Sequence, residues 1–203
     1  MKQKNIDENY QFRCSCCGDC CSGNMDININ LYDLYKIALK LDHSSTEELF
    51  HQKLVTLVEG QNGAWIPRIQ FRRKPFSFCP WLINDLGDEG VLRGFCSLHP
   101  HDKPLVCKLA PVGRIADLTE GSERFVLTAP TENCPGMESG CENSLAELKE
   151  ELRKELDLEF RFFAILEKMS GMDKKEYEKI YRLDCAISFE NQLRQWEIDF
   201  GIE

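Results

Sequence analysis

The sequence predicts an α+β fold, in which an irregular cysteine-rich core with short strands is flanked by N-terminal helices and a C-terminal helical hairpin. Three observations predict this class. Apolar residues recur at helical spacing near both ends of the chain. The middle of the chain carries most of the proline and glycine, which separate short candidate strands. The 11 cysteines cluster near the N-terminus and recur in that middle part.

The length of 203 residues suits one domain with a helical appendage. We expect a flexible tail over residues 1–13 and a cysteine-cluster metal-binding domain over 14–142. An acidic helical segment over 143–203 is expected to pack on that domain.

Two helices are predicted after the first cysteines. The first covers residues 31–41, because Asn30 is a candidate N-cap and apolar residues then recur every three or four positions. The second covers about 46–59, because Ser45 and Glu48 have the spacing of a capping box.

Short strands and turns are predicted in the middle of the chain. The candidate strands are 64–71, 78–83, 91–96 and 123–129. A turn is expected over 85–90, and 97–111 should be a loop with one short helix, since it holds two histidines and three prolines.

The C-terminal part is predicted to be helical. Ser144 and Glu147 open a long helix that runs from about 143 to 169, and Asp173 caps a last helical region. Residues 137–203 hold 17 acidic and 10 basic side chains, a net charge of −7 out of −9 for the chain. Such a charge run is typical of solvated helix faces, and the alternative is an acidic docking surface.

Composition excludes several classes. The mean hydropathy of −0.39 and the lack of any run of about 18 apolar residues argue against a membrane protein. The net charge of −9 argues against a nucleic-acid binder, because nothing offsets phosphate repulsion. The N-terminus lacks the apolar segment of a secretory signal, so we expect a cytoplasmic protein with reduced thiols.

The cysteines carry the chemistry. The run Cys-x-x-Cys-x-x-Cys-Cys lets several sulfurs of one loop reach one ion, and metal binding removes the repulsion between thiolates. With the cysteines farther along the chain, eight candidate metal ligands are Cys14, Cys17, Cys20, Cys21, Cys79, Cys96, Cys107 and Cys134. Eight sulfurs would suit two four-sulfur sites. The three-thiolate run favours an iron–sulfur cluster over zinc.

The combined pattern resembles the CxxCxxCC cysteine-cluster family, described as a zinc- or iron-chelating domain. The matching features are the N-terminal run, Cys-Pro-Trp-Leu at 79–82, Lys-Pro-Leu-Val-Cys at 103–107 and Cys-Pro-Gly at 134–136. The resemblance covers about residues 12–136. It extends distantly to flagellin lysine N-methylases, which are associated with an iron–sulfur cluster. The family usually has Arg-Pro where this chain has Lys103-Pro104.

Other candidate residues have simpler interpretations. Cys16, Cys141 and Cys185 are expected to be ordinary residues, although Cys16 competes with Cys17 as a ligand. His99 and His101 are either ligands or polar loop residues. The basic stretch with Arg68, Arg72, Arg73 and Lys74 is either a solvated strand face or a patch that recognises an anion or a peptide.

Three functions fit this pattern. The first is a cytosolic metalloprotein that binds an iron–sulfur cluster or zinc, with a protein or peptide as a candidate partner. The second is an enzyme that uses the centre for protein modification, such as lysine methylation, or for redox chemistry. The third is a metal sensor or delivery protein. The sequence contains no recognisable nucleotide or S-adenosylmethionine motif.

Overall fold

The computed structural model describes residues 4–23, 25–60, 63–72, 77–86, 90, 92–118 and 120–202. Within these residues the α-helices are α1 (Leu31–Lys40), α2 (Glu47–His51), α3 (Leu105–Leu109), α4 (Leu145–Glu151), α5 (Arg153–Lys168), α6 (Lys174–Ile180) and α7 (Phe189–Asp199). Two 3-10 turns are η1 (Asp19–Cys21) and η2 (Pro135–Glu138). The described strands are β1 (Lys4–Ile6), β2 (Asn9–Gln11), β3 (Val55–Glu59), β4 (Trp65–Ile69), β5 (Leu82–Leu86), β6 (Leu92–Cys96), β7 (Val112–Asp117), β8 (Ser122–Leu127) and β9 (Glu142–Ser144).

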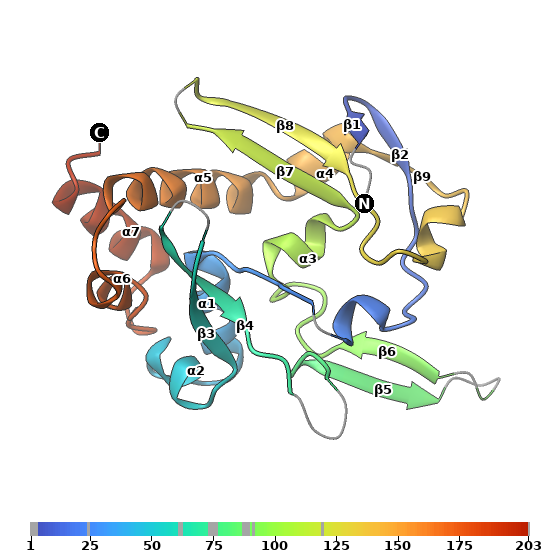
Figure 1. Ribbon diagram of the computed structural model, residues 1–203, viewed down its shortest axis with the longest axis horizontal. Coiled ribbons are helices and arrows are strands. Elements are labelled where there is room, and N and C mark those ends of the chain that lie inside the picture. Colours follow the sequence, from blue (N-terminus) through green and yellow to red (C-terminus); the bar gives the residue numbers. More distant parts are fainter. Residues whose placement is uncertain are drawn as a thin grey trace.

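The α+β class is confirmed, and every described strand pair is antiparallel. The strands form a three-stranded sheet in the order β1-β8-β7 and the separate pairs β2-β9, β3-β4 and β5-β6. Figure 1 shows helices α1, α2, α6 and α7 at one end of the molecule and the β5-β6 hairpin at the other, with η1 and α3 between them.

The main core joins the two ends of the chain. Buried side chains of α1, β3 and β4 pack with those of α5, α6 and α7 in one cluster. Two buried tyrosines complete it, because the Tyr177 hydroxyl donates to the Met169 carbonyl at 2.9 Å and that of Tyr181 to the Trp65 carbonyl at 2.7 Å. A smaller cluster packs α3 against α4 and α5 through Leu105 and Leu156. This contact positions the helix that carries Cys107.

Several predicted helix starts are confirmed. The Asn30 side chain accepts the backbone N–H of Asp33 at 2.8 Å, and the Asp33 carboxylate accepts the N–H of Asn30 at 3.3 Å. This reciprocal pair satisfies two N–H groups that the first helical turn leaves without partners. Ser144 and Asp173 likewise accept backbone N–H groups at the starts of α4 and α6.

The predicted helix over 46–59 is wrong in its second half. Helix α2 ends at His51, and residues 55–59 form β3, which pairs with β4. Buried and exposed side chains alternate along Val55, Thr56 and Leu57, which is strand periodicity. The predicted capping box is also absent from α2, because the Glu48 carboxylate instead accepts the N–H and hydroxyl of Ser44, each at 2.8 Å.

The long helix expected over 143–169 is divided. Residues 142–144 form β9, and α4 and α5 meet at Leu152, whose ψ of 8° departs from helical geometry. The hydrogen bonds of Leu152 to Leu148 and of Leu156 to Leu152 remain, at 3.0 and 2.9 Å. Leu152 is buried against α3, so tertiary packing accompanies the bend.

Three further expectations are corrected. Residues 4–6 and 9–11, expected in a flexible tail, are strands β1 and β2, because they find partners in β8 and β9. The strand expected at 78–83 begins only at Leu82, after a turn in which the Leu82 N–H donates to the Cys79 carbonyl at 3.1 Å. Strand β7 was not expected. Much of the turn predicted over 85–90 lies outside the described residues.

Candidate metal centre

The N-terminal cysteine loop is held against the β5-β6 hairpin by a close backbone contact. Gly18 has a φ of +78°, a left-handed conformation that favours glycine. A Cβ placed on Gly94 would lie 2.8 Å from the Gly18 Cα, so only glycine at position 94 allows this approach. The Gly94 N–H also donates to the Cys16 carbonyl at 2.7 Å. The hairpin thus fixes the loop that carries the first four candidate ligands.

Two remote cysteines flank the same loop. The Cys79 N–H donates to the Cys21 carbonyl at 2.7 Å, so these residues are neighbours through the backbone. Cys96 is the last residue of β6 and pairs with Leu82 of β5. Leu82 follows Cys79 by three residues. The hairpin therefore delivers both Cys79 and Cys96 to the edge of η1.

The last two candidate ligands come from other elements. Cys107 lies within α3, whose position depends on its packing against α5. Cys134 precedes η2, and the Arg13 N–H donates to the Gly136 carbonyl at 3.1 Å. A Cβ on Gly136 would lie 2.6 Å from the Arg13 carbonyl oxygen, so this contact also requires glycine. It brings Cys134 close to the start of the cysteine loop.

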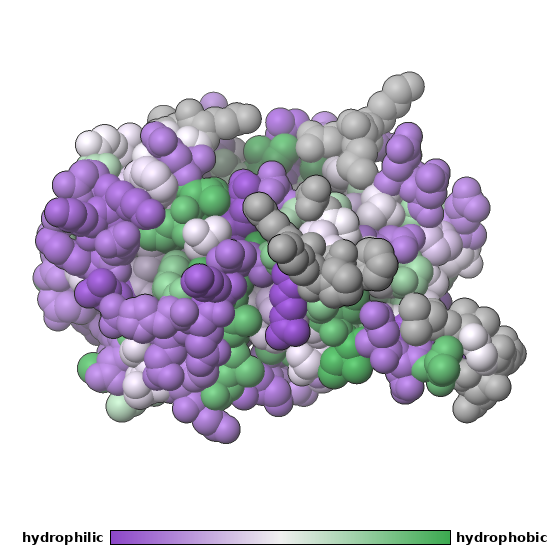
Figure 2. Space-filling model, turned by 60° about the horizontal axis from the view of Figure 1, so that its bottom comes forward, coloured by the Kyte–Doolittle hydropathy of each residue, from purple (hydrophilic) through white to green (hydrophobic). Residues whose placement is uncertain are grey.

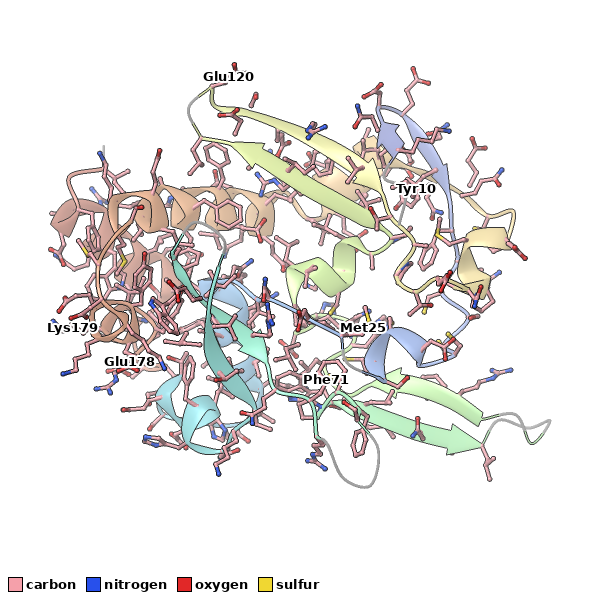
Figure 3. All side chains as sticks on the ribbon, in the orientation of Figure 1. Tyr10, Met25, Phe71, Glu120, Glu178 and Lys179 are labelled. Carbon is pink, nitrogen blue, oxygen red and sulfur yellow. The ribbon has the colours of Figure 1, made fainter. Side chains whose placement is uncertain are left out.

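Charge interactions between thiols identify which cysteines are neighbours. Burial, with smaller contributions from the charges of Cys96 and Cys20, raises the pKa of Cys79 to about 11, against hydrogen bonds from the backbone. The pKa of Cys107 is raised first by burial and then by the charges of Cys79 and Cys96. The pKa of Cys21 is raised by its hydrogen bond with Cys20 and by burial, and also by the charges of Cys79 and Cys107. Five cysteines from four chain segments therefore share one environment, and Figure 3 shows sulfur atoms around η1 and α3.

The thiols of Cys20 and Cys21 are hydrogen-bonded to each other within that group. Their sulfurs are 3.9 Å apart. The hydrogen bond that Cys21 donates lowers the pKa of Cys20, and the same bond raises the pKa of Cys21. Cys20 is thus the more acidic thiol and the readier thiolate of the pair.

An outer group lies beside the central five. The pKa of Cys134 is raised mainly by burial, with smaller contributions from the charges of Cys17 and Cys20. The pKa of Cys16 is raised by burial and then by the charge of its neighbour Cys14. Cys14 and Cys17 are solvent-exposed. Cys20 thus links the central group to Cys134 and Cys17.

The charge of Lys103 acts on four of the cysteines, and that of Arg93 acts on Cys16 as well. The Lys103 charge lowers the pKa values of Cys16, Cys96 and Cys107, where burial is the larger cause and acts upward. It also lowers the pKa of Cys20, after the hydrogen bond from Cys21. A cation close to several thiols favours their ionised form. Lys103 therefore lies near enough to the sulfurs to favour thiolates at this place.

Buried charges clamp the segment with Lys103 and Cys107 onto the helices. The Asp33 carboxylate, 1% exposed, accepts the Leu105 N–H at 2.9 Å at the start of α3. The Lys36 ammonium donates to the Lys103 carbonyl at 3.0 Å and to Glu155 of α5 at 2.6 Å. Gly94, Gly136 and this clamp were not identified from the sequence. A glycine within a predicted strand is a signal for close backbone approach, whereas the clamp has no sequence signal.

The sulfurs are gathered but are not in ligating geometry. Within the described ranges, no three His, Cys, Asp or Glu side chains are arranged to hold a metal ion. All eleven cysteines are free thiols. Cys185 has other surroundings, since its backbone N–H donates to the Ser44 carbonyl at 2.9 Å and its pKa is raised by burial and by the charges of Asp184 and Glu48.

Other predicted features have separate surroundings. Arg68 of the basic stretch pairs with Asp26 at 2.8 Å, and residues 73–76 lie outside the described residues. Two surface pockets of about 470 and 730 Å³ are lined by other residues and by no cysteine. Across the described part of the chain, no helix combines the length and apolarity that crossing a bilayer needs.

Comparison with known proteins adds no relative to this description. No family model matches the chain. No curated protein and no solved structure matches it either. The candidate site is therefore defined by the cysteine pattern and by the geometry described above.

Proposed function

We propose that this protein is a metalloprotein that binds an iron–sulfur cluster, or alternatively zinc, through clustered cysteine thiolates. One observation carries the proposal. Cys20, Cys21, Cys79, Cys96 and Cys107 come from four separate chain segments that the fold brings together, as the 2.7 Å hydrogen bond from the Cys79 N–H to the Cys21 carbonyl and the 3.9 Å separation of the Cys20 and Cys21 sulfurs illustrate.

The chemistry of the donor set fits a metal centre. Burial raises the pKa of Cys79, Cys96 and Cys107, so these thiols are neutral when no cation is near. A bound metal ion reverses this preference, because thiolate ligands are deprotonated by the cation that they hold. Lys103 provides further positive charge at the same place. Exposed clustered thiols such as Cys14 and Cys17, by contrast, are prone to oxidation when no metal holds them.

The eight candidate ligands divide into two groups in this proposal. The central group supplies ligands for a first site. The outer group, with Cys14, Cys17 and Cys134, supplies ligands for a second site next to Cys20. A reducing compartment such as the cytoplasm is part of the proposal, because free thiolates persist there.

The metal and its form are tested by one assay. Protein purified without oxygen is analysed for iron, zinc and acid-labile sulfide. Iron and sulfide in stoichiometric amounts, with a visible absorption band, are the result expected for an iron–sulfur cluster. Stoichiometric zinc without sulfide would show that the bound metal is zinc and not an iron–sulfur cluster. A protein with neither metal, which also takes up neither on reconstitution, would refute metal binding.

Variants test which cysteines bind. Cys79→Ser and Cys107→Ser each remove one thiolate of the central group and are expected to lower the metal content by at least one site. Cys185→Ser is the matched control, because this cysteine lies beside Ser44 and Asp184 and no other thiol of the described residues acts on its pKa. Equal metal content in all three variants would contradict the proposed ligands.

A further inference from the structure

The β5-β6 hairpin has one covered face and one open face. The covered face contains Leu82 and Gly94, both of which contact Gly18 of the cysteine loop. Side chains on a strand alternate between faces, so Ile83 and Phe95 point to the opposite side. Ile83 is 52% exposed and Phe95 is 43% exposed, and the two lie opposite each other, so they form an adjacent apolar pair on this face. The part of the molecule where this hairpin lies carries apolar residues at its surface, at the lower right of Figure 2.

The open face is self-complementary. Ile83 lies directly opposite Phe95, and Asp85 lies directly opposite Arg93, so one strand carries the acid and the other carries the base. Asp85 and Arg93 are exposed, and in the described residues neither forms an ion pair with another side chain. We propose that this face binds a second copy of the chain, which makes the protein a two-fold symmetric dimer.

The register of the hairpin determines how two copies would meet. A two-fold axis parallel to the strands places β5 of one copy over β6 of the other. Each Ile83 then packs on Phe95 of the second copy, and each Asp85 meets Arg93 of the second copy. Such an isologous contact uses the same residues on both sides, as in most homodimers. The face is small and each chain has a net charge of −9, so the association is weak and depends on concentration.

The first test measures mass against concentration. Sedimentation or light scattering is carried out on the protein as purified, without oxygen and with excess reductant, so that disulfide-linked dimers do not form. The mass should rise from 23.5 kDa toward twice that value as concentration increases. A mass that stays at the monomer value up to millimolar protein would overturn the proposal.

Variants of the apolar pair come next. Ile83→Ser and Phe95→Ser should weaken association by about tenfold or more, since they remove the centre of the contact. Leu86→Ser is the matched control, because Leu86 is 70% exposed on the same hairpin but belongs to the other face. If Leu86→Ser weakens association equally, the contact is non-specific and the proposed face is wrong.

A charge exchange provides the most specific test. Asp85→Arg and Arg93→Asp each create like-charge contacts and should weaken association by about tenfold or more. The double variant restores opposite charges across a two-fold interface and should recover most of the wild-type affinity. A double variant no tighter than either single one would refute this geometry. Unchanged metal content and circular dichroism in all variants would show that folding is intact.

Discussion

The substitution Lys36→Met tests the clamp that joins the cysteine segment to the helices. The Lys36 side chain is 9% exposed, and its ammonium lies 3.2 Å from the Asp33 carboxylate and 2.6 Å from that of Glu155. It also donates to the Lys103 carbonyl. Methionine keeps the apolar stem and removes only the charge and the donors. The substitution therefore isolates the electrostatic part of the contact.

The expected loss of stability is large. Without Lys36, the buried Asp33 carboxylate keeps two backbone N–H donors but has no counterion. Removing one partner of a buried ion pair costs about 3–5 kcal/mol. For a chain of this length, 1 kcal/mol corresponds to about 2–4 °C, so the midpoint of thermal unfolding should fall by roughly 6–20 °C.

The effect should depend on pH. Burial raises the pKa of Asp33 to about 6, although the nearby Lys36 charge lowers it. The ordinary value is 3.8, so the folded protein binds the proton more tightly, and ionising Asp33 at neutral pH costs about 3 kcal/mol. The tighter proton binding stabilises the folded state fully below pH 3.8, and this stabilisation is lost as pH rises through 6, where Asp33 must ionise. Without Lys36 the pKa of Asp33 rises further. The loss of stability caused by the substitution should therefore be larger at pH 8 than at pH 5.

Urea unfolding followed by circular dichroism at pH 5 and pH 8 measures both effects. Lys40→Met is the control, because Lys40 is 50% exposed and 3.8 Å from Asp102, and exposed pairs are worth about 0–1 kcal/mol. A loss below about 1 kcal/mol at pH 8 for Lys36→Met, or an equal loss at both pH values, would refute the reasoning.

Three other predictions concern the cysteine loop and the core. Gly94→Ala should reduce the metal content, because the new Cβ would lie 2.8 Å from the Gly18 Cα. Asn84→Ala, at the position directly opposite Gly94, should leave the metal content unchanged. Metal analysis of both variants measures the difference. Removal of metal by a chelator should raise hydrogen exchange in η1 and α3 while α5 to α7 stay largely helical, since these three helices carry none of the candidate ligands. Uniform protection before and after removal would contradict this. Thr46→Val should cost about 1–3 kcal/mol in urea unfolding, because the fully buried Thr46 hydroxyl bonds Tyr181 and Leu183, and a loss near zero would count against it.

Elements encoded by neighbouring residues were predictable from the sequence. The start of α1 follows from Asn30 and Asp33, which satisfy each other's backbone N–H groups within four residues. The start of α6 at Asp173 has the same local origin. The predicted helix over 46–59 failed because the apolar positions of residues 54–58 suit both periods, and pairing with β4 decides between them.

The cysteine pattern and composition alone indicated which residues carry the chemistry, because thiol spacing is written directly in the chain. Only the tertiary structure decided which cysteines are neighbours. The central and outer groups depend on contacts between residues far apart in sequence: Gly18 with Gly94, Arg13 with Gly136, and Asp33 with Leu105. Such contacts depend on backbone approach and on buried charges from several elements at once. A glycine within a predicted strand, such as Gly94, signals that another backbone approaches, but no local pattern identifies the partner, which lies far away in sequence.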